Sequence, residues 1–324
     1  MLTRIYYGWF VVLGLFLILT VSSGFGFYNM SVYINVLAAR TGFAISEISV
    51  AVSLFFVVGG VAGIAVAWLL ERYDIRWVMV GGAALAGASL GASGQVTSLW
   101  ELYGLYLLFG IGNSSVSIVT STTLVTRWFP GKNRSVALSV ASTGLSMGGI
   151  LLTPLSARLF NEFGVERVMP WIGMAFVLLI VPIVVGVLKP RPDAKSISSS
   201  GVDLDSGWSY RGAIRSRFFV LLTAAYVFCM CAQVGGIAHL YNRVEGLAGF
   251  AIAANAVQVL TLMSIVFRII GGLLVMQFSI RTFTLMNLVG QALGLAVVAG
   301  ADGAAGLLLG AGLFGASVGN LLML

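Results

Sequence analysis

Charged side chains are scarce in this sequence. Asp, Glu, Lys and Arg together make up 9% of the 324 residues, whereas 59% of the residues are hydrophobic. With a mean hydropathy of +1.02, this composition lies far outside the range of soluble globular domains and excludes that class. What the chain has instead is a series of long apolar runs, so we expect an all-α protein that crosses a lipid bilayer repeatedly.

Residues that ligate metals or act as nucleophiles are also few. The chain has one histidine, His239, near the outer end of an apolar run, where an interfacial position is expected. Cys229 and Cys231 stand two apart in one predicted helix, so they cannot easily pair and are interpreted as small hydrophobic residues. An HExxH pattern is absent, as is a pair of intramembrane acids. We therefore expect no metal site, no cofactor and no intramembrane enzyme.

Ten apolar runs are long enough to span the hydrocarbon core, which takes about 20 helical residues. The first follows a very short N-terminus and lacks a signal-peptide cleavage site, so we expect it to remain as a helix. The predicted spans cover residues 9–35, 48–69, 77–97, 102–126, 135–157, 168–188, 218–240, 250–275, 282–300 and 304–324.

Basic residues divide unequally between the alternating loops that ten spans create. With a cytoplasmic N-terminus, 13 of the 18 Lys and Arg fall on the cytoplasmic side and 4 on the other. This asymmetry follows the positive-inside rule, so the net charge of +7 reflects topology and not a nucleic-acid partner. We predict a multi-pass protein of the plasma (cytoplasmic, or bacterial inner) membrane with its N-terminus in the cytoplasm.

A polar stretch at 189–217 divides the chain into two halves. We interpret it as a cytoplasmic linker between an N-terminal six-helix bundle, 1–188, and a partial C-terminal bundle, 218–324. An offset of 205 aligns Ile75 and Arg76 with Ile280 and Arg281, and also aligns the Leu-Phe-Gly triplets that end at Gly110 and Gly315. A shared offset favours a parallel repeat of six spans each. The sequence ends in the fourth span of the second half, so we expect spans eleven and twelve to be missing.

Polar or small residues recur at helical spacing on three of the spans. Packing between helices is the alternative explanation for such residues, and the glycine pairs 87/91, 144/148, 290/294 and 315/319 fit that role. The first polar stripe is Ser22, Gly26, Asn29 and Tyr33; the second is Tyr106, Gly110, Asn113, Ser117 and Thr120; the third is Thr261, Ser264 and Arg268.

Arg268 lies close to the centre of the apolar run 260–278. A charge at the bilayer centre costs roughly 2.5–3.5 kcal/mol even on permissive insertion scales. Three structural explanations remain open: a shallower position, a side chain that snorkels to the cytoplasmic interface, or an ion pair with a distant acid. Otherwise the guanidinium serves an anionic ligand, because its donors match a carboxylate bidentately.

These residues resemble the major facilitator superfamily over the whole chain. The segment ERYDIR, 71–76, is similar to that family's G-x-x-x-D-R-x-G-R-[RK] loop after the second span, with Asp74 in place of its glycine. YYGWFVV at 6–12 and RWFPGKNRSVALSVASTGLSMGG at 127–149 resemble the monocarboxylate transporter and oxalate-formate antiporter branch. The eighth-span arginine of that branch, which is taken to bind the substrate carboxylate, falls on Arg268.

The resemblance implies a fold of two pseudo-repeated six-helix bundles, of which the second is incomplete. It also implies a monomeric secondary transporter that moves small organic anions such as lactate, formate or oxalate by alternating access, coupled to a proton or a counter-anion. Ser264 stands where animal monocarboxylate transporters carry an acid, and Tyr106 stands where many members carry an arginine. The expected substrate-binding residues are Arg268, Ser264, Asn29, Tyr33, Tyr106 and Asn113, and the expected cytoplasmic gate is Glu71, Arg72, Arg76, Arg127, Arg134 and Arg281.

Two other functions fit the same fold. One is an exporter of amphipathic compounds or a carrier of a non-carboxylate solute. The other is a sensor or receptor derived from a transporter, against which the absence of a substantial soluble domain counts.

Overall fold

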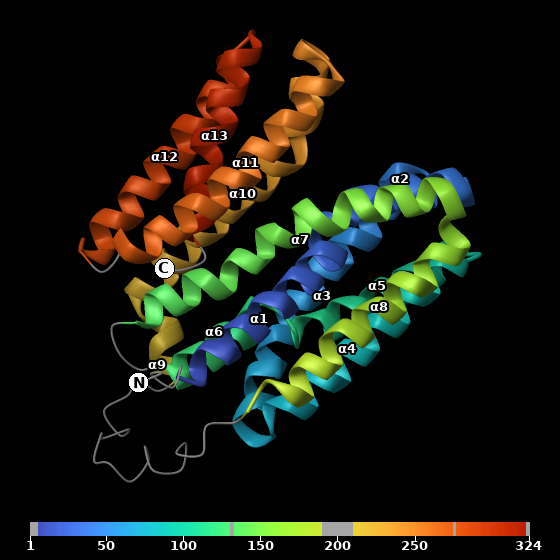
Figure 1. The fold of residues 1–324 in the computed structure, drawn as a ribbon, viewed down its shortest axis with the longest axis horizontal. Coiled ribbons are helices and arrows are strands. Elements are labelled where there is room, and N and C mark those ends of the chain that lie inside the picture. Colours follow the sequence, from blue (N-terminus) through green and yellow to red (C-terminus); the bar gives the residue numbers. More distant parts are fainter. Residues whose placement is uncertain (1–5, 130–132, 190–209, 275–276, 322–324) are drawn as a thin grey trace, which may run out of the picture. The chain divides into compact units, whose positions relative to one another are not determined.

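The computed structural model describes residues 6–129, 133–189, 210–274 and 277–321 (Figure 1). The chain divides into two compact units. The first comprises Met1–Pro190 together with Arg268–Met276, and the second comprises Arg191–Phe267 together with Gln277–Leu322. The helix that carries Arg268 therefore contributes its last residues to the first unit.

The first unit is built from helices that follow the predicted spans closely. Polar residues between the apolar runs cap these helices, as Asp74 does for α4 and Ser98 for α5 by accepting from backbone N–H groups. Its elements are α1 (Gly8–Ser23), η1 (Gly24–Tyr28), α2 (Met30–Thr41), α3 (Ile45–Arg72), α4 (Ile75–Ala92), η2 (Ser93–Gln95), α5 (Leu99–Ser114), α6 (Ile118–Trp128), α7 (Arg134–Phe163) and α8 (Val165–Gly186).

The second unit contains four long helices after a short one. Ser216 and Ser279 cap α10 and α12, and Gly249, with φ +84°, ends α10 in a conformation that favours glycine. The elements are α9 (Tyr210–Arg215), α10 (Arg217–Ala248), α11 (Phe250–Leu274), α12 (Ile280–Gly300) and α13 (Ala304–Leu321). Residues 190–209 of the predicted linker lie outside the described residues, and the bundle boundaries at 188 and 218 stay a prediction.

Ten helical spans were expected, and the described residues account for each of them. Nine helical segments are long and apolar enough to cross a membrane, and α13 supplies a shorter apolar helix over Ala304–Asn320. The chain is thus an all-α, multi-pass membrane protein, as its composition indicates.

Two spans that the sequence predicts as single helices are interrupted. The first contains a π-helical segment, η1, in which each backbone N–H bonds one residue further back than in an α-helix. The fourth breaks between α5 and α6, where Ser114 and Ser117 donate their hydroxyls to the backbone carbonyls of Ile111 and Ser114. Serines that bond the local backbone compete with a regular helix, which explains the second interruption.

The predicted glycine pairs do mediate close helix packing. A Cβ on Gly148 of α7 would lie 2.6 Å from the Gly24 nitrogen, so α1 and η1 lie directly against α7 (Figure 1). Gly87 and Gly173 bring α4 and α8 together in the same way, and Gly294 lets α12 approach Phe314 of α13. Small residues at these positions allow backbones to approach where lipid offers no hydrophobic driving force.

Corresponding positions in the two units pack alike, in agreement with the predicted offset of 205. A Cβ on Gly110 would lie 2.5 Å from the Phe55 carbonyl oxygen, and one on Gly315 would lie 2.8 Å from the Leu260 Cα. Gly110 and Gly315 differ by that offset, and so do Phe55 and Leu260. Helices α4 and α12 also begin at equivalent residues, Ile75 and Ile280. The repeat is therefore visible in the packing of each unit.

Candidate functional site

The first and second polar stripes face each other inside the first unit. Gly26 lies against the Asn113 side chain, since a Cβ on this glycine would be 3.1 Å from Asn113 Oδ1. Two turns away, Tyr33 and Tyr106 are near enough for their hydroxyls to interact electrostatically. Both pairings fit one antiparallel register of the two helices. Gly110, by contrast, packs against α3 and does not face the first stripe.

Asn29 is fully buried, and one end of its amide contacts two hydroxyl groups. Asn29 Nδ2 donates to Ser156 Oγ at 2.7 Å and to Tyr33 Oη at 3.3 Å. The Ser156 hydroxyl in turn donates to the Leu152 carbonyl oxygen at 2.7 Å. The side chain of Asn29 is thus held against α7.

Several buried polar atoms of this region have no hydrogen-bond partner among the described residues. They include two amide oxygens, which can only accept, and two hydroxyls, which can donate or accept. Tyr106 is 1% exposed, and Asn29 and Thr120 are fully buried. The atoms are Asn29 Oδ1, Asn113 Oδ1, Tyr106 Oη and Thr120 Oγ1. Unpaired buried polar groups are rare because each costs free energy, so a cluster of them indicates a place built for something else.

Arg268 is 2% exposed and belongs to the first unit. Its Nη1 donates to the Ser142 carbonyl oxygen of α7, and the guanidinium interacts electrostatically with Tyr28 of η1. One turn later, Gly272 lies against Ser139 of the same helix α7. The hydrogen bond to Ser142 orients the guanidinium toward α7.

The acidic residues within the described ranges are all far from the span centres. Each lies in a loop or in the terminal turns of a helix: Glu47, Glu71, Asp74, Glu101, Glu162, Glu166, Glu245 and Asp302. Ser264, one turn before it on α11, is buried and lies against Gly319 of α13.

Three of the predicted gate residues, Arg72, Arg76 and Arg127, form contacts around the turn between α3 and α4. Arg76 Nη2 forms an ion pair with Asp74 Oδ2 at 3.0 Å, and Arg127 Nη2 donates to the Leu70 carbonyl oxygen at 3.3 Å. The Arg72 guanidinium lies 4.1 Å from the centre of the Trp68 ring, a cation–π contact. Hydrogen bonds from Arg76 hold the pKa of the Asp74 carboxyl below its usual value.

Asp74, which stands in place of the family's glycine, caps α4 and forms an ion pair with Arg76. The sequence pattern alone did not suggest this role. Glu71, the acid that the sequence assigned to the gate, forms no ion pair within the part of the chain that the structure describes. Arg134 at the start of α7 and Arg281 at the start of α12 are exposed. A latch that joins these residues stays a prediction.

Two motifs that were read separately in the sequence form one aromatic cluster. Tyr6 contacts Phe129 with ring centres 5.5 Å apart, and Trp9 contacts Phe129 at 5.2 Å. The Tyr6 hydroxyl donates to the Trp128 carbonyl oxygen at 2.8 Å. The YYGWF and RWF segments thus tie the start of α1 to the end of α6.

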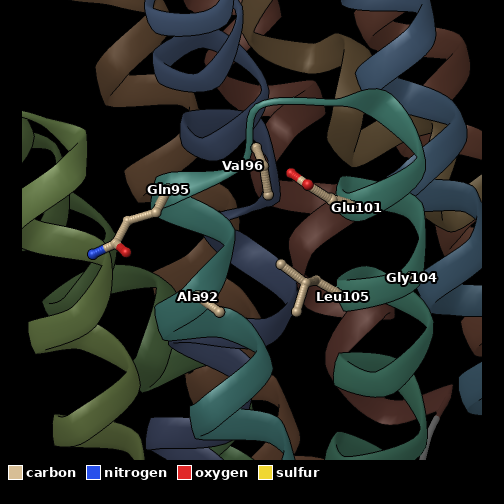
Figure 2. Close-up of a pocket in the computed structure, with 6 residues that line it drawn as sticks. All are labelled: Ala92, Gln95, Val96, Glu101, Gly104 and Leu105. Atoms are coloured by element: carbon tan, nitrogen blue, oxygen red, sulfur yellow. The ribbon is translucent and has the colours of Figure 1, made fainter.

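Two cavities lie away from these residues. One, of about 340 Å³, is formed by Ala92, Gln95, Val96, Glu101, Gly104 and Leu105 around η2 and α5 (Figure 2). The other, of about 470 Å³, is bounded by residues of α10 alone, from Phe219 to Cys231. Neither is lined by any predicted substrate-binding residue, so the candidate site is defined by the polar groups and not by these hollows.

The repeated helical units, the glycine packing and the intramembrane polar groups define a polytopic helical membrane protein with an internal duplication. The chain belongs to the Major Facilitator Superfamily, whose family model matches residues 16–324. This membership favours a transporter over the intramembrane enzyme that the sequence already argues against.

Known relatives agree with this family and with the branch that the sequence motifs indicate. The chain is 25% identical over 253 residues to the oxalate:formate antiporter of Oxalobacter formigenes, covering 78% of this chain and 58% of that protein. It is 33% identical over 134 residues to the probable anion transporter 3 of Arabidopsis thaliana chloroplasts, covering 39% and 25%. The chain therefore spans less than two thirds of the length of these relatives.

Solved structures share the fold. The proton:xylose symporter XylE matches with a TM-score of 0.71 at 14% sequence identity, covering 98% of this chain and 81% of that one. Identity this low supports the fold alone.

Proposed function

We propose that this chain forms all or part of a secondary transporter that moves small organic anions of the monocarboxylate type, such as lactate, formate or oxalate, by alternating access. Arg268 is the anchor for the substrate carboxylate, and Asn29, Tyr33, Tyr106, Asn113 and Ser264 shape the site. The transporter works as a monomer in the plasma membrane with a cytoplasmic N-terminus, coupled to a proton or a counter-anion.

The observation that carries this proposal is an arginine buried within a membrane-spanning helix. Arg268 is 2% exposed, and it lies in the span Asn255–Leu274. Ionisable side chains inside spans are rare because they are costly to bury, and they commonly mark substrate pathways. A guanidinium binds a carboxylate with two parallel hydrogen bonds, which suits an anionic substrate.

Similarity to the oxalate:formate antiporter and to a probable anion transporter supports an anionic cargo. A non-carboxylate cargo would leave Arg268 without this explanation. The gate residues around the α3–α4 turn support a conformational change at the cytoplasmic end, because Asp74, Arg76 and Arg127 form contacts that can break and re-form there.

Binding and uptake with Arg268→Lys test the anchor. The wild-type protein and the variant are compared for uptake of labelled lactate, formate and oxalate into proteoliposomes, and for binding of the same anions in detergent. Lysine keeps the charge but loses the bidentate geometry, so we expect affinity to fall at least about tenfold. Arg217→Lys, at an exposed arginine that starts α10, is the matched control and should change nothing. Equal carboxylate binding by Arg268→Lys would contradict the anchor.

A further inference from the structure

The cavity between η2 and α5 is separate from the proposed transport site and has a chemistry of its own. Ala92 and Val96 lie on one side of it and Leu105 on the other, and the Glu101 carboxylate points between them, whereas Gln95 is directed away (Figure 2). Its volume of about 340 Å³ is at the lower end of the range for small-molecule sites. The cavity therefore combines apolar walls with one acidic group.

The start of α5 holds the Glu101 carboxylate in place. Glu101 Oε2 accepts from the backbone N–H groups of Thr97 and Ser98 at 2.9 and 3.3 Å, and from the Thr97 hydroxyl at 3.1 Å. Glu101 Oε1 has only a 3.5 Å contact with the same hydroxyl. A carboxylate has lone pairs for about four hydrogen bonds. Capping thus orients this acid and leaves one of its oxygens open to a further donor.

The charge of Glu101 is not compensated within the part of the chain that the structure describes. Glu101 forms no ion pair with the described residues. Arg40 donates to the Val96 carbonyl oxygen at 3.2 Å, but its ion pair is with Glu166, at 3.0 Å. A cation that carries N–H groups is therefore the complementary ligand, because hydrogen bonds between charged groups are the stronger ones.

Gly104 keeps the space beside Glu101 open. A Cβ on Gly104 would meet no atom within 4 Å, whereas one on Gly110 or Gly112 of the same helix would meet backbone atoms of a neighbouring helix. Glycine inside a helix is destabilising relative to alanine. Close packing explains the other two glycines but not Gly104, whose missing side chain leaves room for a ligand in the cavity that it lines.

Exposed apolar residues continue from the cavity along α5. Leu108 and Ile111, which are 43% and 40% exposed, follow Gly104 by one and two turns on the same helix face. Trp100 is 82% exposed beside Glu101, and amphipathic rings of this kind mark the level of the lipid headgroups. A lipid fits both features, since its headgroup can enter the cavity while an acyl chain covers the apolar face.

We propose that this cavity binds a phospholipid whose headgroup ends in a primary ammonium group, as in phosphatidylethanolamine. The ammonium group donates to Glu101, and an acyl chain lies along Leu108 and Ile111. In the predicted topology this end of α5 is the outer one, so the lipid belongs to the outer leaflet. The site does not involve Arg268 or the transported anion, so its test is independent of the proposed function.

Lipid binding is measured by protection of the delipidated chain against thermal unfolding in detergent. Dioleoyl phosphatidylethanolamine and dioleoyl phosphatidylglycerol share their acyl chains, and the rise in Tm with lipid concentration gives each dissociation constant. We expect phosphatidylethanolamine to bind at least about tenfold more tightly. The net charge of +7 would by itself favour the anionic lipid. Free ethanolamine, which lacks the acyl chains, should give no protection at the same concentration.

Glu101→Gln removes the charge and keeps the cap, because glutamine also accepts from backbone N–H groups at this position of a helix. The variant should lose the preference for phosphatidylethanolamine, about tenfold, with an unchanged Tm in the absence of lipid. Glu47→Gln is the matched control and should keep the preference. Glu47 caps α3 in the same way, by accepting from the Ala44 N–H at 2.9 Å, and lines neither of the two cavities.

Gly104→Leu fills the cavity and should weaken phosphatidylethanolamine binding at least about tenfold. Its control is Gly63→Leu, at a glycine of α3 whose Cβ would also meet no atom within 4 Å. Equal affinities for the two lipids, or a preference that Glu101→Gln retains, would overturn the proposal. So would wild-type affinity in Gly104→Leu, loss of the preference in Glu47→Gln, or protection by free ethanolamine that equals that of the lipid.

Discussion

Replacing Tyr106 with phenylalanine is expected to stabilise the protein in the absence of a substrate. The Tyr106 hydroxyl is buried and has no hydrogen-bond partner among the described residues. Phenylalanine keeps the ring, which contacts Phe109 edge to face at 6.4 Å, and removes only the unpaired oxygen. An unpaired buried hydroxyl costs about 1–3 kcal/mol, which the variant should regain.

Tyr33→Phe is the matched control for this effect. Tyr33 is equally buried and packs edge to face on Phe160 at 6.0 Å, but its hydroxyl accepts a hydrogen bond from Asn29. Removing that acceptor should destabilise the protein by about 0.5–1.5 kcal/mol. The two substitutions make the same chemical change in the same unit and are expected to have opposite signs.

Thermal unfolding followed by circular dichroism at 222 nm in detergent measures both variants. A change of 1 kcal/mol shifts Tm by about 2–4 °C for a domain of 150–250 residues and by less for a longer chain. Tyr106→Phe should therefore raise Tm by a few degrees, and Tyr33→Phe should lower it by one or a few degrees. If Tyr106→Phe lowered Tm as Tyr33→Phe does, the Tyr106 hydroxyl would have a partner in the free protein, and its role as a vacant substrate contact would be refuted.

Two further predictions concern packing and charge. Gly148→Ala should lose about 1–3 kcal/mol of stability, because the new methyl group would lie 2.6 Å from the Gly24 nitrogen. The control is Gly60→Ala, whose methyl group meets no atom within 4 Å, so its Tm should be unchanged or slightly higher. Equal Tm values for the two variants would refute the close contact of η1 with α7. Asp74 should make the stability of the protein fall at acid pH. Arg76 lowers the pKa of Asp74 in the folded state. The stabilisation from Asp74 is therefore complete above the ordinary carboxyl pKa of about 4, and it is lost as the pH falls through the lower pKa of the folded state. Asp74→Asn should remove this loss of stability at acid pH. The free energy of unfolding is measured by urea titration from pH 6 to pH 3, and the same pH dependence in the variant and the wild type would contradict the Arg76 pairing.

The sequence was sufficient to predict the membrane spans and the helix faces on which the first two polar stripes lie. Spacings of three and four residues placed Asn29 with Tyr33 and Asn113 with Tyr106, and the structure brings these two pairs together. The same periodicity could not reveal η1 or the break at Ser115, because both depend on backbone hydrogen bonds that leave the apolar pattern intact. Regular helical spacing therefore predicted which faces of the two helices meet, but it assigned Gly110 to the wrong face.

Partners that lie far apart in the chain were beyond prediction for a physical reason. Ser156 contacts the Asn29 amide from 127 residues away, and nothing in its own neighbourhood marks it among the serines of α7. Arg268 meets the Ser142 backbone carbonyl, a group that every residue carries, so no residue type could have indicated it. Asp74 was visible as a departure from the family loop, but its pairing with Arg76 follows only from the geometry of the helix start.

The unpaired polar atoms of the first unit carry an energetic cost. A packed helical bundle gains stability by pairing or removing such groups, and apolar side chains of similar size are available for each. Asn29 is the clearest case, because one end of its amide meets Ser156 and Tyr33 while the other end has no partner among the described residues. A structural role is complete with the first end alone. In a transporter of the kind proposed above, the second end is available to a cargo, and a group left unpaired in the empty protein then contributes to binding.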